Sequence, residues 1–220
     1  MTEQTTNNTN PQLSIVLVVH DEAEALEQNL PVFLSHETDV PFEVIVVDDS
    51  STDGTPDILK NMKEQYPHLH TTFFPQSVPN PSRMQLALYV GIKAAKSQRI
   101  VIADINRPPF TPTWIEGLVA EMDSNITEVA MVYSNSKNPE IVTFQSFTQL
   151  EDAEPLLRKA ERRSGKGHQG RRMKFKRGLY DAVAISHERI YDAIRLFDQP
   201  VKGFDLIGLR LHVFFKNLTA

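Results

Sequence analysis

A chain of 220 residues, of which 40% are hydrophobic and 23% are charged, is long enough to form one α/β domain with a sizeable core. It contains no cysteine, which excludes disulfides and thiolate chemistry. No apolar run approaches the roughly 18 to 20 residues of a membrane-spanning helix. The formal net charge is −5, yet residues 158–177 hold ten Lys/Arg and a single acid, Glu161. This segregation of charge indicates a face that meets an anion.

Strands and helices alternate over the first part of the chain, after a polar lead over residues 1–12 that we expect to be disordered. The lead lacks the basic and apolar regions of a signal peptide, so we also expect a cytoplasmic protein. Short apolar runs predict strands, and apolar residues at helical spacing predict helices. The predicted strands are 13–19, 42–47, 71–74 and 100–103, and the predicted helices are 23–36, 56–66, 83–96 and 114–122. This alternation predicts an α/β fold with a mostly parallel, Rossmann-like sheet flanked by helices.

The pattern changes after Glu128. Two apolar segments, 129–134 and 141–147, are typical of strands in a mixed or antiparallel C-terminal portion, and residues 150–163 have the spacing of an amphipathic helix. The last predicted segments are 180–185, 190–197 and 206–215. No internal repeat interrupts the chain, and we expect a single domain over residues 13–220.

Three of the predicted strands end in acidic residues. The first is followed by Asp21 and Glu22, the second by Asp48 and Asp49, and the fourth by Asp104. Strands that are apolar throughout are buried on both faces, and ligands of such parallel sheets bind just beyond the carboxyl ends of the strands. These acids therefore predict a ligand site along one edge of the sheet. A helix cap is the alternative for any one acid, but it does not explain an adjacent pair.

Two residues near this edge are expected to have structural roles. Asp53 precedes the helix that Pro56 opens, and because Asp is a preferred helix cap we expect it to cap that helix rather than to contact a ligand. Trp114, the single tryptophan, stands between a proline-rich loop and a helix. We expect it to be a packing anchor rather than a platform for a sugar.

Four longer segments carry recognisable motifs. They are LSIVLVVHDEAEALEQNL (13–30), FEVIVVDDSSTDGT (42–55), LALYVGIKAAKSQRIVIADINRPPFTPTW (86–114) and GRRMKFKRGLY (170–180). The first two are similar to SVVIPxYNE and EIIVVDDGSTDGT, and the others to LTLGIKAAKxxxxxxTDADCRPxSxxW and GRNLAYRKSLF of a bacterial subgroup. On these motifs the chain resembles the inverting family 2 glycosyltransferases of bacteria, which have the GT-A fold.

The resemblance implies a function. Members of this family transfer a sugar from a nucleotide diphosphate sugar to an acceptor hydroxyl, with inversion of the anomeric centre. For this chain the resemblance implies a UDP- or GDP-sugar donor, a glycan or lipid-linked acceptor, and a role in cell-envelope or surface-polysaccharide synthesis. Within a single GT-A-like domain, residues 13–123 would form the nucleotide-binding half and residues 124–220 the acceptor-binding half.

The resemblance also assigns a nucleotide site. His20, Glu22, Asp48 and Asp49 would line the nucleoside pocket, and Arg83 would lie near the base or the diphosphate. The diphosphate leaving group carries concentrated negative charge, so basic side chains near it would add charge-assisted hydrogen bonds.

Two motifs depart from the family pattern. Asp104 and Asn106 occupy the D-x-D that holds a divalent metal, Mg²⁺ or Mn²⁺, but Asn106 offers a carbonyl oxygen without charge. Because metal affinity depends on the number of charged ligands, we expect a metal site that is weakened or absent. The family's general base lies in an E-D or G-D-D motif, whereas this chain has KGFDL (202–206). Asp205 is the acid left in that motif, and it is either the base or a neighbour that survived the loss of the base.

The basic segment 158–177 has three interpretations. It is a solvated loop, or Arg171, Arg172 and Lys174 clamp a phosphate of the donor or of a lipid diphosphate acceptor, or it touches an anionic membrane. In the last case each basic residue would add on the order of 1 kcal/mol. We do not expect nucleic-acid binding, because the rest of the chain is acidic and would be repelled by phosphates.

Three functions follow from these patterns. The first is an active glycosyltransferase, and the alternative is a catalytically degenerate relative that binds a nucleotide or a partner protein. A nucleotidyltransferase shares the doubly wound layout, but it normally has a basic, glycine-rich loop after the first strand. Residues 20–25 of this chain, HDEAEA, are acidic and free of glycine, which makes that function the least expected.

Overall fold

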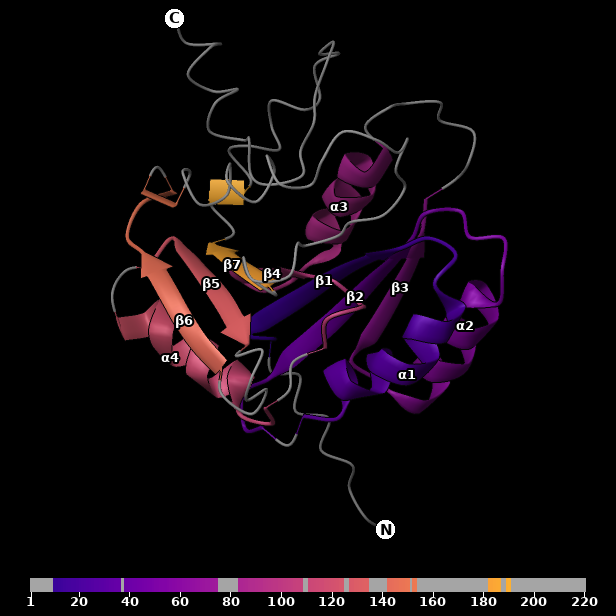
Figure 1. Cartoon of the computed structure of the whole chain (residues 1–220), viewed down its shortest axis with the longest axis horizontal. Coiled ribbons are helices and arrows are strands. Elements are labelled where there is room, and N and C mark those ends of the chain that lie inside the picture. Colours follow the sequence, from indigo (N-terminus) through magenta and orange to yellow (C-terminus); the bar gives the residue numbers. More distant parts are fainter. Residues whose placement is uncertain are drawn as a thin grey trace, which may run out of the picture.

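The computed structural model describes residues 10–36, 38–74, 83–108, 111–124, 127–134, 142–150, 152–153, 182–186 and 189–190, without the side chains of residues 83–85, 124 and 134. These residues form a seven-stranded sheet with four helices packed on its two faces (Figure 1).

The elements agree closely with the pattern of apolar residues. In chain order they are β1 (Leu13–Val19), α1 (Ala23–Leu34), β2 (Phe42–Asp48), α2 (Thr55–Gln65), β3 (Leu69–Phe73), α3 (Arg83–Ala94), β4 (Arg99–Ala103), α4 (Trp114–Ser124), β5 (Val129–Ser134), β6 (Val142–Phe147) and β7 (Ala182–Ser186). Each strand and helix predicted before residue 148 is present, with ends that differ by at most two residues.

The sheet is parallel in one part and antiparallel in the other. Its strand order is β3-β2-β1-β4-β7-β5-β6. β1 is parallel to β2 and β4, and β2 is parallel to β3. β7 is antiparallel to both β4 and β5, and β5 is antiparallel to β6. This arrangement confirms the predicted α/β fold with a mixed C-terminal portion, and β7 joins the two parts of the sheet.

β1 is buried along its whole length because helices cover both faces of the sheet. Alternate side chains of a strand point to opposite faces. Leu13, Ile15 and Leu17 pack in a core with α1, α2 and α4, whereas Val16 and Val18 pack in a core with α3. Figure 1 shows α3 on the other side of the sheet from α1 and α2. The uninterrupted apolar run in the sequence is the consequence of this double cover.

A glycine sets the distance between α3 and the sheet. A Cβ atom at Gly91 would lie 2.6 Å from Cγ1 of Val16 and 2.9 Å from Cγ2 of Val47. Both distances are shorter than a carbon–carbon contact allows. The backbone of α3 can therefore lie this close to β1 and β2 only because residue 91 has no side chain.

Trp114 packs at the start of α4 and is only 2% exposed. Its Nε1 donates a hydrogen bond to Nε2 of His36 at 2.6 Å, and the two rings meet edge to face. His36 also contacts the ring of Phe42 at the start of β2. The packing role predicted for Trp114 is confirmed, and its contact with His36 links α4 to the segment between α1 and β2.

Some predicted segments lie mostly outside the described residues. They are the helix over 150–163, the segments 190–197 and 206–215, and the lead over 1–12. Within the described part of the chain, no helix combines the length and the apolar character that a membrane crossing requires.

Candidate functional site

The acidic residues at the carboxyl ends of β1, β2 and β4 lie along one edge of the sheet. These strands are parallel neighbours, and the register pairs Val19 with Asp48 and Leu17 with Ala103. Their carboxyl ends therefore open on the same side. Three of the acids are buried: Asp48, Asp49 and Asp104 are 4%, 1% and 5% exposed. Buried carboxylates need hydrogen-bond partners, and the loops around them supply several.

The loop after β2 is folded by its own acids and hydroxyls. Oδ1 of Asp48 accepts a hydrogen bond from the backbone N–H of Ser51 at 2.9 Å, which closes a short turn. Ser50 has a φ of 57°, in the left-handed region, and its hydroxyl donates to the carbonyl of Phe74. These bonds fix the direction in which Asp48 and Asp49 leave the strand.

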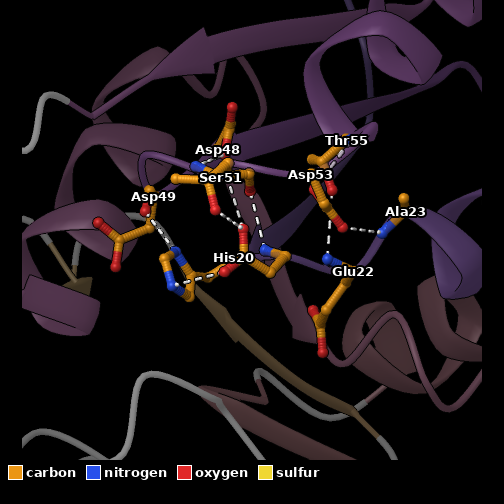
Figure 2. A network of polar contacts seen from close by, with 10 residues as sticks. His20, Glu22, Ala23, Asp48, Asp49, Ser51, Asp53 and Thr55 are labelled. Atoms are coloured by element: carbon orange, nitrogen blue, oxygen red, sulfur yellow. Dashed lines mark hydrogen bonds and ion pairs between the residues drawn. The ribbon is translucent and has the colours of Figure 1, made fainter.

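The loops after β1 and β2 are held together by hydrogen bonds (Figure 2). The N–H of Asp21 donates to Oγ of Ser51 at 2.9 Å, and the N–H of Glu22 donates to Oγ1 of Thr55 at 3.2 Å. In return, Oδ1 of Asp21 accepts from the N–H of Thr52 at 2.7 Å. This last bond lowers the pKa of Asp21 below its ordinary value. Asp21 therefore holds the loop after β1 against the loop after β2 through hydrogen bonds of its backbone and its side chain.

Asp53 connects the first residues of two helices. Its Oδ1 accepts from the N–H of Thr55 in α2, and its Oδ2 accepts from the N–H of Ala23 in α1, both at 3.0 Å. Asp53 is not the N-cap residue itself, which is Gly54 in α2 and Glu22 in α1, but its carboxylate accepts hydrogen bonds from the first residue of each helix. Burial raises the pKa of Asp53, but these hydrogen bonds outweigh it and the pKa is lowered overall.

His20 is directed into the loop that follows β2. Its Nδ1 donates to the carbonyl oxygen of Asp49 at 2.7 Å, and its Nε2 lies 3.3 Å from Oδ2 of Asp21. The backbone N–H of Asp49 in turn donates to the carbonyl of Val19 at 2.8 Å. Figure 2 shows His20 between the two loops, next to Asp49. The structure thus places His20 beside the acids with which the sequence grouped it.

Asp104 and Asn106, at the end of β4, reach the loop that follows β1. Nδ2 of Asn106 donates to Oε1 of Glu22 at 2.9 Å and to Oδ1 of Asp104 at 3.1 Å. The backbone N–H of Asn106 also donates to Oδ1 of Asp104, at 3.0 Å. The expected metal ligands Asp104 and Asn106 therefore lie together, with Glu22 as a third group. In this arrangement Asn106 presents its nitrogen to the carboxylates, and nitrogen of an amide does not bind a metal cation.

Other predicted site residues are not described. Arg83 is the first residue of α3, but its side chain is not described, and Arg171, Arg172 and Asp205 lie outside the described residues. Among the described residues, no group of three His, Cys, Asp or Glu side chains is placed to hold a metal ion.

The hydroxyls that connect the loops were not predicted from the sequence. Ser51 and Thr55 each accept a hydrogen bond from the loop after β1, about thirty residues earlier in the chain. Asn29 in α1 was not predicted either; its Nδ2 donates to the carbonyl of Ile105 at 3.0 Å and holds the loop after β4. A cluster of Ser and Thr after an acidic strand end is a signal for such loops, but it does not identify their partners.

The comparison of the sequence with known families shows to which family the chain belongs. Glycosyl transferase family 2 matches residues 14–187. The chain belongs to this family. A hyaluronan synthase from Pasteurella multocida is 28% identical over 117 residues, which are 52% of this chain and 12% of the synthase. This chain spans between 12% and 16% of the length of the curated relatives that it matches.

Solved structures of glycosyltransferases share the fold of this family 2 chain. A mannosyltransferase from Pyrobaculum calidifontis in complex with GDP-Man and Mn²⁺ has a TM-score of 0.51 at 21% identity, over 84% of this chain and 47% of the other. Glucosyl-3-phosphoglycerate synthase from Mycobacterium tuberculosis in complex with UDP has a TM-score of 0.52 at 17% identity, over 95% of this chain and 66% of the other. The fold is therefore that of the GT-A glycosyltransferases.

Proposed function

We propose that the carboxyl edge of β1, β2 and β4 binds a nucleotide diphosphate sugar, linked to UDP or GDP, and that the protein transfers the sugar to an acceptor hydroxyl. The observation that carries the proposal is the group of buried carboxylates at this edge, in a chain that belongs to glycosyl transferase family 2. Neighbours of the same fold were solved with GDP-Man and with UDP, which supports a nucleotide-sugar donor.

The chemistry of the edge suits a nucleoside. Carboxylate oxygens only accept hydrogen bonds, and a nucleoside offers donors in the N–H groups of its base and the hydroxyls of its ribose. Asp49 follows β2 directly, and hydrogen bonds between the loops hold its backbone in place. We infer that Asp48 and Asp49, with His20 and Glu22 beside them, recognise the nucleoside part of the donor.

The transfer itself requires a base and a stabilised leaving group. The acceptor oxygen forms a bond to the anomeric carbon while the bond from that carbon to the diphosphate oxygen breaks, which inverts the centre. We propose that Asp205 takes the proton of the acceptor hydroxyl. We further propose that Arg83, Arg171 and Arg172 offset the charge of the diphosphate. The same proposal includes an acceptor in cell-envelope or surface-polysaccharide synthesis. It also includes a cytoplasmic location and contact of the basic segment 158–177 with an anionic membrane.

The experiment that tests the donor site is calorimetric titration of the protein with UDP and GDP, followed by assay of the same samples for hydrolysis of UDP- and GDP-sugars. We expect one nucleotide to bind and its sugar to be released. Asp49→Asn should weaken that binding by about tenfold or more, because a hydrogen bond to a charged group contributes about 1.5–3 kcal/mol.

Asp57→Asn is the matched control, since Asp57 lies in the first turn of α2, exposed and outside the site. The control should bind the nucleotide as the unchanged protein does. Equal binding by Asp49→Asn and the unchanged protein would reject the site assignment. Binding without release of the sugar, also in the presence of acceptors, would favour the degenerate relative.

A further inference from the structure

Asn106 stands between two carboxylates that come from different loops. Its single Nδ2 atom lies 2.9 Å from Oε1 of Glu22 and 3.1 Å from Oδ1 of Asp104. The two carboxylate oxygens are therefore within hydrogen-bond reach of one point. A cation bound to both carboxylates would lie near that point.

The orientation of the amide follows from its neighbours. Both neighbours are acceptors when ionised, and of the two ends of an amide only the NH₂ group can donate to them. The backbone N–H of Asn106 donates to Asp104 as well, at 3.0 Å, so the turn favours the same orientation. To bind a metal through its carbonyl oxygen, Asn106 would have to turn its amide and give up both side-chain hydrogen bonds.

We propose that the amide of Asn106 takes the place of the divalent cation at this site, so that the donor nucleotide binds without a metal. This inference rests on the proposed donor site and specifies how its edge near the diphosphate is built. The amide supplies two N–H donors that hold the carboxylates of Glu22 and Asp104 together, which a cation would otherwise do by its charge. With an aspartate at position 106 the three carboxylates would repel one another, and a hard cation with oxygen ligands would relieve that repulsion.

The first test measures the metal directly on the protein alone. Thermal unfolding is followed with EDTA and with Mn²⁺ for the unchanged protein, Asn106→Asp and Asn106→Ala. The melting temperature of the unchanged protein should be the same in Mn²⁺ as in EDTA. The melting temperature of Asn106→Asp should be higher in Mn²⁺ than in EDTA. Asn106→Ala, which removes the amide and adds no charge, should respond less than Asn106→Asp.

Asn61→Asp is the matched control, because Asn61 is exposed on α2 and gains the same carboxylate away from the site. It should show no response to Mn²⁺. A rise of the melting temperature with Mn²⁺ in the unchanged protein as large as in Asn106→Asp would overturn the proposal. The absence of any rise in Asn106→Asp would overturn it as well, since the point between the carboxylates would then not be suited to a cation.

The second test uses the nucleotide. Affinity for UDP or GDP should differ by less than about threefold between EDTA and Mn²⁺ in the unchanged protein, and by about tenfold or more in Asn106→Asp. A tenfold requirement for Mn²⁺ in the unchanged protein would reject the proposal. If no variant binds any nucleotide, the proposed donor site fails, and the thermal measurements still decide whether Asn106 replaces a cation.

Discussion

The residues of the site differ in how far the sequence could predict them. The placement of Asp48, Asp49 and Asp104 along one edge was predictable, because parallel strands carry their carboxyl ends to the same edge of the sheet. The bonds that Ser51 and Thr55 accept could not be predicted, because they join loops about thirty residues apart. The position of the Asn106 amide could not be predicted either, because it depends on the distance between the loops after β1 and β4.

Asp205 carries the sharpest prediction at the scale of a single residue. If it is the general base, Asp205→Asn should lower kcat for sugar transfer by about 10²–10⁴-fold, because the acceptor hydroxyl then keeps its proton as it attacks. Binding of the nucleotide should not change, and calorimetric titration of the same variant provides that control. Transfer at the normal rate by Asp205→Asn would show that Asp205 is only the neighbour of a lost base.

At the scale of elements, β2 shows that an apolar strand can contain a buried carboxyl group. Glu43 is the second residue of β2 and only 2% exposed. Its Oε1 accepts hydrogen bonds from the hydroxyl of Ser14 at 2.6 Å and from the N–H of Lys96 at 2.7 Å. Glu43 thus links the segment after α3 to the amino ends of β1 and β2, opposite the proposed site. The strand was predictable from its neighbours, but this link was not.

The close approach of α3 to the sheet gives a prediction for Gly91. Gly91→Ala should lower the free energy of unfolding by about 1–3 kcal/mol, because the added methyl group would overlap Val16 and Val47 and force α3 away from β1 and β2. Chemical denaturation measures the change. Gly54→Ala is the matched control: its Cβ would lie 3.7 Å from that of Ala23, an ordinary contact, and its φ of −73° suits alanine. The control should stay within about 0.5 kcal/mol of the unchanged protein, and equal stability of both variants would contradict the packing argument.

At the scale of the whole molecule, the alternating strands and helices of the first part of the chain were predictable, but the order of the strands in the sheet was not. Alternating strands and helices up to Met122 imply a parallel sheet, because each helix returns the chain to the same end of the sheet. The insertion of β7 between β4 and β5 depends on pairing between segments about eighty and fifty residues apart. No local pattern specifies which strand lies between β4 and β5, since any strand with two apolar faces would fit that position.

Partly buried histidines, among them His36 and His68, should make the stability of the protein depend on pH. Burial lowers the pKa of His36 below its ordinary value of 6.5, and this outweighs the hydrogen bond that His36 donates to the backbone carbonyl of Pro112 and the charge of Glu116. Burial also lowers the pKa of His68, whose Nε2 donates to the carbonyl of Leu34 at 3.0 Å. A lowered pKa in the folded protein means that the unfolded chain takes up the proton first as the pH falls.

The contribution of His36 to stability should therefore be complete above about pH 6.5 and should be lost as the pH falls below that value toward the folded pKa. Neutral His36 accepts the hydrogen bond of Trp114, and protonated His36 cannot. His36→Gln keeps an acceptor for Trp114 without a titrating group. The stability of this variant should fall less between pH 7.5 and pH 5.5 than that of the unchanged protein. Chemical denaturation followed by the fluorescence of Trp114 measures both, and an equal fall in the two proteins would show that the His36–Trp114 contact does not govern the acid sensitivity of the fold.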